Sequence, residues 1–305
     1  MRTLIIIPVL LFSLLLGVPS YSADFNKGLT AAQSGDFATA LKEWKPLAEE
    51  GDAVAQFNLG LMYSKGWGVP QDYKEAVRWY TLAAEQGNVN SQYNLGLIYG
   101  EENGSLTDYK KAFKFFKLVA DQGDPGGQFA IGESYEKGLG TNKDINEAIK
   151  WYRLAAEQGS ANAQNALGEL AFLGEGLPQD DKKAVAWYRL AANQGHPKAQ
   201  FNLGEMYSGG FGVPEDLNEM FRLYSLSAEQ GYDFAQERLG NSYLNGKGIR
   251  IDEVYAYMWF NLAAGSGNEY AAKERDKLSK TLSSAQLEEA QRLGRECVKK
   301  NYKGC

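Results

Sequence analysis

Residues 52–87 read DAVAQFNLGLMYSKGWGVPQDYKEAVRWYTLAAEQG, and this stretch decides the fold because its pattern returns every 36 residues. Three columns show the period without a slip: Gln56, Gln92, Gln128, Gln164, Gln200 and Gln236; Gly60, Gly96, Gly132, Gly168, Gly204 and Gly240; Gly87, Gly123, Gly159, Gly195, Gly231 and Gly267. Six successive units of equal length, without insertion or deletion, predict an array of stacked units in place of a single globular core.

Each unit has the pattern of two helices. The first, at residues 53–65, carries Gln56, Leu59, Gly60 and Tyr63 at the i, i+3, i+4, i+7 spacing of one buried stripe. The second, at residues 73–86, has apolar columns that persist in every unit, and they are represented by Ala76, Val77, Tyr80, Leu82, Ala83 and Ala84. The fold class expected is therefore all-α, a solenoid of antiparallel helix pairs.

Capping residues mark the expected helix ends. Asp stands before every second helix, where its carboxylate can accept from free amides: Asp72, Asp108, Asp144, Asp180, Asp216 and Asp252. Glu75, Glu147 and Glu219 follow at the position that completes a capping box. Gly87 and its equivalents close the second helices, where a left-handed residue is favoured. These acidic and glycine columns thus have a structural explanation.

The first 22 residues differ from the rest. Arg2 precedes an apolar run at residues 4–16, and Ser20 and Ser22 place small residues before a cleavage site at Ala23. The run is short for a membrane span, so we expect a signal peptide at 1–22, with an uncleaved anchor as the alternative. The exported protein is expected in the periplasm, with secretion as the alternative, and without a later membrane span.

The ends of the array are expected to differ from its middle. The predicted organisation is an abbreviated helix pair at 23–51, six repeats at 52–267 and capping helices with a cysteine tail at 268–305. Cys297 and Cys305 are the only cysteines, and export permits a disulfide between them. A metal site needs more ligands than this pair offers.

Composition and motifs argue against nucleic-acid binding and catalysis. The net charge is −6 and no basic run exceeds two residues, so no overall field attracts nucleic acid. The single histidine, His196, precedes Pro197 at a helix start and fits a cap. We find no nucleophile elbow, phosphate loop or calcium loop. The sequence therefore predicts no catalytic residue, no cofactor and no metal.

A second stripe on the first helices is the candidate partner-binding groove. Columns 57 and 61 lie off the packed stripe and, in a helix-pair solenoid, are expected on the inner, concave surface. The candidate residues are Phe57, Leu61, Tyr93, Leu97, Phe129, Glu133, Glu169, Phe201, Glu205 and Glu237. The groove would begin apolar and turn acidic, which favours a protein or peptide with a basic part. Packing of the column 57 aromatics against a neighbouring unit is the alternative.

The repeat resembles the Sel1-like repeat, a relative of the tetratricopeptide repeat. The resemblance rests on Ala55-Gln56-x-x-Leu59-Gly60-x-x-Tyr63, then Gly66-x-Gly68-Val69 and Trp79-Tyr80-x-x-Ala83-Ala84-x-Gln86-Gly87. It implies a right-handed α-solenoid that serves as an adaptor for other proteins. One branch of the family is cysteine-rich with a proposed β-lactam-binding activity, but the repeats here contain no Cys.

Three functions therefore compete at this point. The first is a non-catalytic scaffold that binds a protein or peptide. The second is an envelope factor that binds glycan or peptidoglycan through Trp and Tyr, although Trp79, Trp151, Trp187 and Trp259 share a repeat column and fit the scaffold. The third is a hydrolase of the cysteine-rich type. The sequence indicates no oligomeric state.

Overall fold

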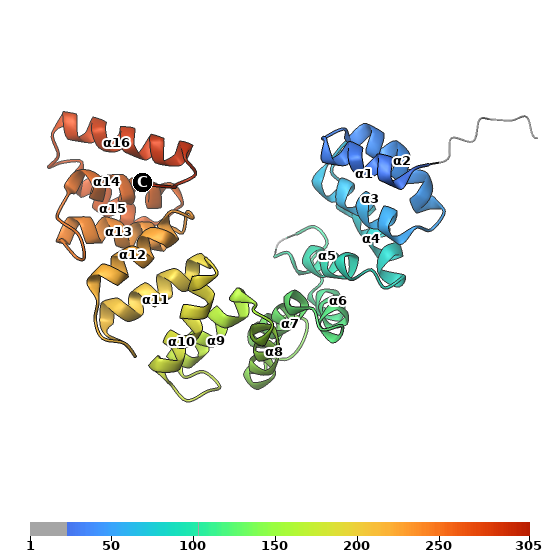
Figure 1. The fold of residues 1–305 in the computed structure, drawn as a ribbon, viewed down its shortest axis with the longest axis horizontal. Helices are drawn as coiled ribbons and strands as arrows, with labels where there is room; N and C mark the ends of the chain where they lie inside the picture. The colour runs from blue at the N-terminus through green and yellow to red at the C-terminus, as the bar shows by residue number, and fades with distance from the viewer. Residues whose placement is uncertain (1–22, 103) are drawn as a thin grey trace, which may run out of the picture. The chain divides into compact units, whose positions relative to one another are not determined.

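The computed structural model describes residues 23–102 and 104–305, and their regular structure is entirely helical (Figure 1). The helices are α1 (Phe25–Gln33), α2 (Phe37–Glu49), α3 (Ala53–Lys65), α4 (Tyr73–Glu85), α5 (Val89–Gly100), α6 (Tyr109–Asp121), α7 (Pro125–Lys137), α8 (Ile145–Glu157), α9 (Ala161–Leu173), α10 (Asp181–Asn193), α11 (Pro197–Gly209), α12 (Leu217–Ala228), α13 (Asp233–Asn245), α14 (Glu253–Gly265), α15 (Glu269–Leu278) and α16 (Ser284–Lys299). The signal peptide expected at 1–22 lies outside the described residues. Within them, no helix combines the length and apolar character that a membrane crossing requires.

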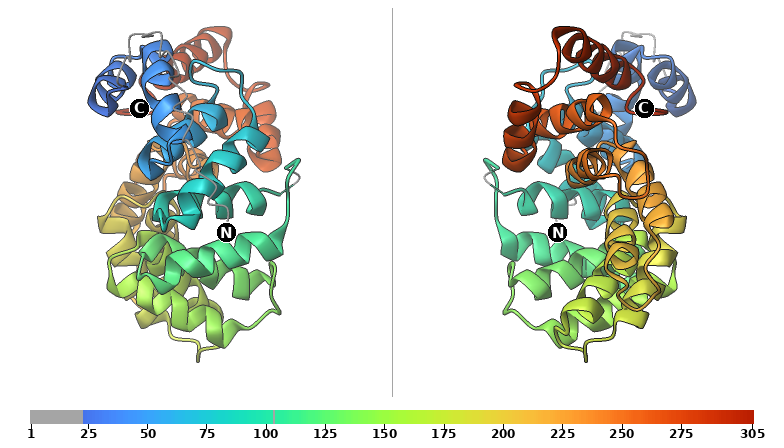
Figure 2. Two further views of the ribbon diagram at one scale, coloured as in Figure 1. Left: turned by 90° about the vertical axis from the view of Figure 1, so that its right-hand side faces the viewer. Right: turned by 90° about the vertical axis from the view of Figure 1, so that its left-hand side faces the viewer.

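The chain divides into two compact units, and the division falls within α5. Unit 1 ends at Asn94 and unit 2 begins at Leu95. Within each unit helices pack against helices next to them in the chain, as in α3 with α4 and in α7 with α8, while the last helix, α16, packs on α14. Figure 2 shows the helix pairs of unit 2 following one another along the chain. The all-α solenoid of helix pairs is confirmed.

Unit 1 contains the abbreviated pair α1 and α2, followed by α3 and α4. Trp44 of α2 is buried with Leu59 and Met62 of α3 and Trp79 of α4 in one apolar cluster. The pair α1–α2 therefore caps the core of the following repeat and does not form a core of its own.

Glycine in the first helix makes room for an aromatic ring of the second. A Cβ added at Gly132 would lie 2.5 Å from the ring of Tyr152, which is fully buried. The same contact recurs between Gly168 and Tyr188 at 2.6 Å. Because no Cβ fits there, the two helices of a pair approach at the glycine column and the ring fills the space beside it.

The predicted N-caps are confirmed, but the predicted capping boxes are wrong. Each second-helix Asp accepts from amides of the first turn, as Asp144 does from Asn146 and Glu147. The amide of Asp144 itself donates to the carbonyl of Tyr135 at 2.9 Å, so it needs no side-chain acceptor. The carboxylate of Glu147 pairs instead with Lys150. Glu75 and Glu219 likewise turn to Arg78 and Arg222.

The C-terminal helices cover the last repeat. α16 packs on α14 and buries Ala290, Gly294 and Cys297. Cys297 and Cys305 form a disulfide. The loop that this disulfide closes places Tyr302 against Gly231, in the turn between α12 and α13.

The leucine column of the second helices lies at the surface. The buried stripe of α8 is Ala148, Ile149, Tyr152, Ala155 and Ala156. The leucine two residues after the buried Tyr points about 200° away from it around the helix. The exposed members of the column are Leu82, Leu118, Leu154, Leu190 and Leu226.

Candidate functional site

We call the exposed surface of the first helices of unit 2 the odd-helix face (α7, α9, α11, α13 and α15). Side chains bridge successive first helices directly. The amide of Asn202 on α11 donates to Asn165 and Glu169 on α9, at 3.0 and 3.1 Å. The guanidinium of Arg238 on α13 donates to Glu205 on α11 at 2.9 Å. Neighbouring repeats are thus joined along this face by polar contacts.

The phenylalanines of column 57 pack against the second helix of their own repeat, and Phe201 also contacts Phe234 of the next repeat. Phe129 lies 5.6 Å from the ring of Tyr152, and Phe201 lies 5.8 Å from Tyr224. In unit 1, Phe57 makes the same contact with Tyr80 at 6.0 Å. These phenylalanines are half-buried, so they contribute to hairpin packing and leave only part of each ring for another molecule.

Each carboxylate of column 61 already has a cationic partner. The pairs are Glu133 with Lys137 at 2.8 Å, Glu169 with Lys198 at 2.6 Å and Glu205 with Arg238 at 2.9 Å. The side chains keep 37%, 31% and 37% of their surface exposed. The acidic column predicted from the sequence is therefore a mixed-charge row.

Glu205 is the most strongly connected of these carboxylates. It also accepts from the hydroxyl of Tyr224. Burial raises the pKa of Tyr224, and the charge of Glu205 raises it further. Burial lowers the pKa of Arg238. The hydrogen bond to Glu205 and the attraction of its negative charge outweigh burial, so the pKa of Arg238 is raised. Tyr224 and Arg238 therefore hold Glu205 in place.

The other predicted groove residues have different surroundings. Glu237 is buried, and its carboxylate contacts Arg238 at 2.8 Å and Asn268 at 3.0 Å, so it offers little surface to a partner. Leu61 and Tyr93 of unit 1 are half-buried, whereas Leu97, in unit 2, is exposed.

Exposed aromatic residues also occur on this face in a column outside the predicted groove. Phe234 on α13 and Tyr270 on α15 occupy equivalent positions 36 residues apart and are 51% and 47% exposed. Phe234 also contacts Phe201 and Tyr232, with ring centroids 6.3 and 5.7 Å apart. Column 54 is the second residue of each first helix, and an aromatic residue at that position is the sequence signal for this pair.

The side chains expected to lack catalytic roles have structural surroundings. His196 caps α11 by accepting from the amide of Ala199 at 3.0 Å, and burial lowers its pKa. Trp79 and Trp259 are buried, while Trp151 and Trp187 are half-buried. In the described part of the chain, no three His, Cys, Asp or Glu side chains come together to hold a metal ion.

Comparison with known proteins identifies the repeat. The Sel1 repeat family model matches residues 53–88, 89–124, 125–160, 161–196, 197–232 and 233–268. The chain is 34% identical to a protective antigen of uropathogenic Escherichia coli, c5321, which displays an SLR fold, with a TM-score of 0.80 over 91% of this chain and 61% of that protein. The chain therefore spans less than two thirds of the antigen's length.

A second solved structure agrees. A Sel1 repeat protein from Oxalobacter formigenes is 33% identical, with a TM-score of 0.74 over 83% of this chain and 75% of that one. No curated protein matches the chain. The six family matches together cover more than half of the sequence. The chain belongs to the Sel1 repeat family.

Proposed function

We propose that this protein is a non-catalytic scaffold that holds a partner protein on the odd-helix face of unit 2. Sel1 repeat proteins generally mediate protein–protein interaction, which supports the class of function. The observation that carries the location is the pair of exposed rings, Phe234 and Tyr270, one repeat apart on first helices. Aromatic residues on a rigid helical surface can anchor a partner because they bury a large area at little entropic cost.

A basic part of the partner would lie toward Glu133, Glu169 and Glu205. Each of these carboxylates already pairs with a Lys or Arg. The binding free energy that an incoming cation contributes is therefore only the difference between the new ion pair and the existing one. We therefore expect charge to orient the partner and the aromatic pair to supply most of the affinity.

The aromatic pair can be tested with a double variant, Phe234→Ser and Tyr270→Ser. Crosslinking pull-down in the native host should recover a defined protein with the unaltered chain and lose it with the double variant. Phe211→Ser is the matched control, because Phe211 is also exposed but lies in the linker after α11. Equal recovery with the double variant would refute the proposed surface. Capture of purified peptidoglycan in protein-free buffer would favour a glycan-binding factor.

The basic character of the partner has its own test. Replacing Glu133, Glu169 and Glu205 with Gln removes three negative charges and frees their Lys and Arg partners. A partner with a basic segment should then bind more weakly at low salt, where screening is least. An unchanged affinity at low salt would contradict the proposed basic segment of the partner, but it would not contradict the scaffold function.

We also propose that the protein acts in the periplasm. Support comes from the signal-peptide pattern at 1–22 and from the C-terminal disulfide, which suits an oxidising compartment. Cell fractionation with N-terminal sequencing should give a periplasmic form that begins at Ala23. A form found only in the cytoplasm with an intact N-terminus would contradict export.

A further inference from the structure

Four second helices of unit 2 are richer in cations than the first helices. Helices α6, α8, α10 and α12 together contain ten Lys or Arg and five Asp or Glu within their bounds, and their N-cap residues Asp108, Asp144, Asp180 and Asp216 add four carboxylates at the helix starts. Helices α7, α9, α11 and α13 contain three Lys or Arg and six Asp or Glu. We call the surface of α6, α8, α10 and α12 the even-helix face. Lys117 on α6 lies over the ring of Trp151 on α8, 5.2 Å from its centroid, so successive second helices are neighbours on this face.

The even-helix face presents a row of exposed leucines. Leu118, Leu154, Leu190 and Leu226 are 42%, 45%, 48% and 37% exposed. Exposed cations stand beside these leucines in the sequence, such as Arg153 before Leu154 and Arg189 before Leu190. A single exposed leucine is ordinary, but the same exposed position on four successive second helices gives this face a repeated apolar feature.

Two arginines of this face have no acidic partner. Among the described residues, no carboxylate forms an ion pair with Arg153 or Arg189, whereas Arg222 is held by both oxygens of Glu219. One guanidinium nitrogen of Arg189 donates to the hydroxyl of Tyr207 at 3.2 Å. A planar guanidinium fixed in this way retains donors for a carboxylate from another molecule.

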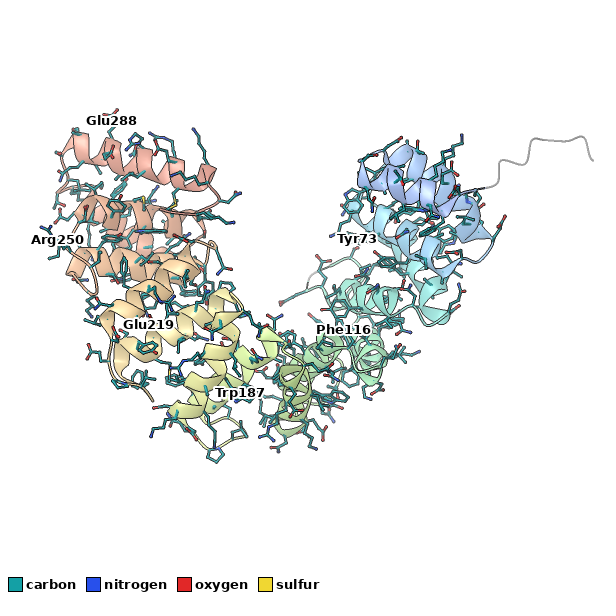
Figure 3. The ribbon with its side chains drawn as sticks, viewed as in Figure 1. Tyr73, Phe116, Trp187, Glu219, Arg250 and Glu288 are labelled. Atoms are coloured by element: carbon teal, nitrogen blue, oxygen red, sulfur yellow. A yellow bond between two sulfur atoms is a disulfide. The ribbon has the colours of Figure 1, made fainter. Side chains whose placement is uncertain are left out.

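A hollow of about 380 Å³ lies beside Arg189, between α10, α11 and α12. Its lining includes the charged side chains of Arg189, Arg222 and Glu219, the hydroxyl of Tyr207, and the apolar side chains of Leu203, Leu223 and Leu226. Figure 3 labels Trp187 on α10 and Glu219 on α12, the two helices that bound it. The hollow therefore combines polar and apolar side chains, and of its two arginines only Arg189 lacks an acidic partner among the described residues.

We propose that the even-helix face of unit 2 docks an acidic amphipathic helix of a partner protein. Its apolar side chains would cover the leucine row and enter the hollow, and its carboxylates would meet Arg153 and Arg189. Apart from the hollow, which α11 also lines, this surface belongs to other helices than the odd-helix face and carries arginines without acidic partners in the described part of the chain, so the scaffold can hold two segments of opposite character. A concave hollow fits a side chain better than a flat bilayer, and the net charge of −6 opposes an anionic membrane.

The test uses a defined peptide, because the partner is unidentified. The probe is a fluorescein-labelled helical peptide with Leu at i, i+3, i+4 and i+7 and Glu at most other positions; a second peptide has Lys in place of Glu. Fluorescence anisotropy with the purified chain should show binding of the Glu peptide that weakens with salt. The Lys peptide is suited only to the carboxylates of the odd-helix face, so any binding of it should not be weakened by changes at Arg153 and Arg189.

Charge reversal locates the site. Arg153→Glu with Arg189→Glu should weaken binding of the Glu peptide by about tenfold or more, because both arginines would then repel it. Lys247→Glu with Arg250→Glu is the matched control. It changes the net charge equally at exposed positions after α13 and should change the affinity by less than about twofold. All four side chains are exposed, and circular dichroism would check that both variants fold.

Three outcomes would overturn the proposal. They are no binding of the Glu peptide, an equal loss of its binding in the two double variants, and tighter binding to vesicles of phosphatidylcholine and phosphatidylglycerol that depends on the same arginines. The Phe234→Ser, Tyr270→Ser variant should bind the peptide normally, and loss of binding there would show a single shared site. Failure of the peptide test would leave the pull-down test of the odd-helix face unaffected.

Discussion

The side-chain amide of Gln194 donates to the side-chain oxygen of Gln164 over 2.7 Å. Gln164 is buried on α9, and its own amide donates to the carbonyl of Ala156 on α8 at 3.2 Å. One glutamine thus connects α8, α9 and the end of α10. The same bond joins three other pairs of glutamines that are 30 residues apart. These pairs are Gln56 with Gln86, Gln128 with Gln158, and Gln200 with Gln230.

Replacing Gln164 with Met should destabilise the array by about 1–2 kcal/mol. The change removes both bonds and leaves the buried carbonyl of Ala156 without that donor, whereas Gln194 is exposed and can bind water. Urea denaturation followed by circular dichroism would measure the loss.

Gln236 is the matched control for this substitution. It occupies the same column and is buried, but Ser266 stands where a glutamine partner would be, and the Gln236 oxygen lacks a hydrogen-bond partner among the described residues. Gln236→Met should therefore cost less than half as much as Gln164→Met. Equal losses would mean that side-chain volume, and not the glutamine pair, explains the column.

Gly140→Ala should destabilise the protein far more than Gly159→Ala. Both glycines have positive φ, +74° and +89°, so an alanine is strained by about 1 kcal/mol at either position. A Cβ at Gly140 would also lie 2.0 Å from the carbonyl oxygen of Tyr109, the first residue of α6, whereas a Cβ at Gly159 meets nothing within 4 Å. Melting temperatures of the two variants would check this, and similar shifts would contradict the close contact.

The fold could be predicted from the sequence because its determinants are local and repeated. Asp72 and Gly87 specify helix ends through contacts within a few residues, and each appears six times. The predicted capping boxes do not form, because a contact between two different helices takes their place. The amide that Glu147 would have capped is already bonded to the carbonyl of Tyr135 in the preceding helix.

The surfaces were harder to predict because their contacts cross between repeats. Lys198 and Arg238 reach Glu169 and Glu205 from the next unit, 29 and 33 residues away, so a column considered alone looks acidic. Leucine in every unit suggests a packed position, but its angular position on the helix exposes it. The residues that pack each repeat were therefore predictable, and the partners of its surface charges were not.

Asp180→Asn should reduce the acid sensitivity of the protein. The backbone hydrogen bond from Lys183, followed by the Lys183 side chain, lowers the pKa of Asp180 below its usual 3.8. A carboxyl with a lowered folded-state pKa stabilises the fold above pH 3.8, and this contribution disappears as the pH falls through the folded-state pKa. Asn also caps helices well, so the variant should be nearly as stable at neutral pH. Thermal melts would show the two proteins converging below pH 3.8. A gap that persists at that acidity would contradict a role for the carboxylate charge.

Reduction of the Cys297–Cys305 disulfide should release the C-terminal tail. Asn301 and Tyr302 have positive φ, 50° and 64°, which non-glycine residues rarely adopt without support. The closed loop holds Tyr302 beside Gly231, and the amide of Gly304 donates to Glu229 at 3.2 Å. Closing so short a loop stabilises the folded state by about 2.5 kcal/mol in a chain-entropy estimate.

Dithiothreitol should thus lower the stability of the natural chain and speed amide exchange at residues 300–305. Cys297→Ala with Cys305→Ala is the control, because its stability should not respond to the reductant. If the reductant leaves the natural chain unchanged, the disulfide does not hold the tail against the turn between α12 and α13.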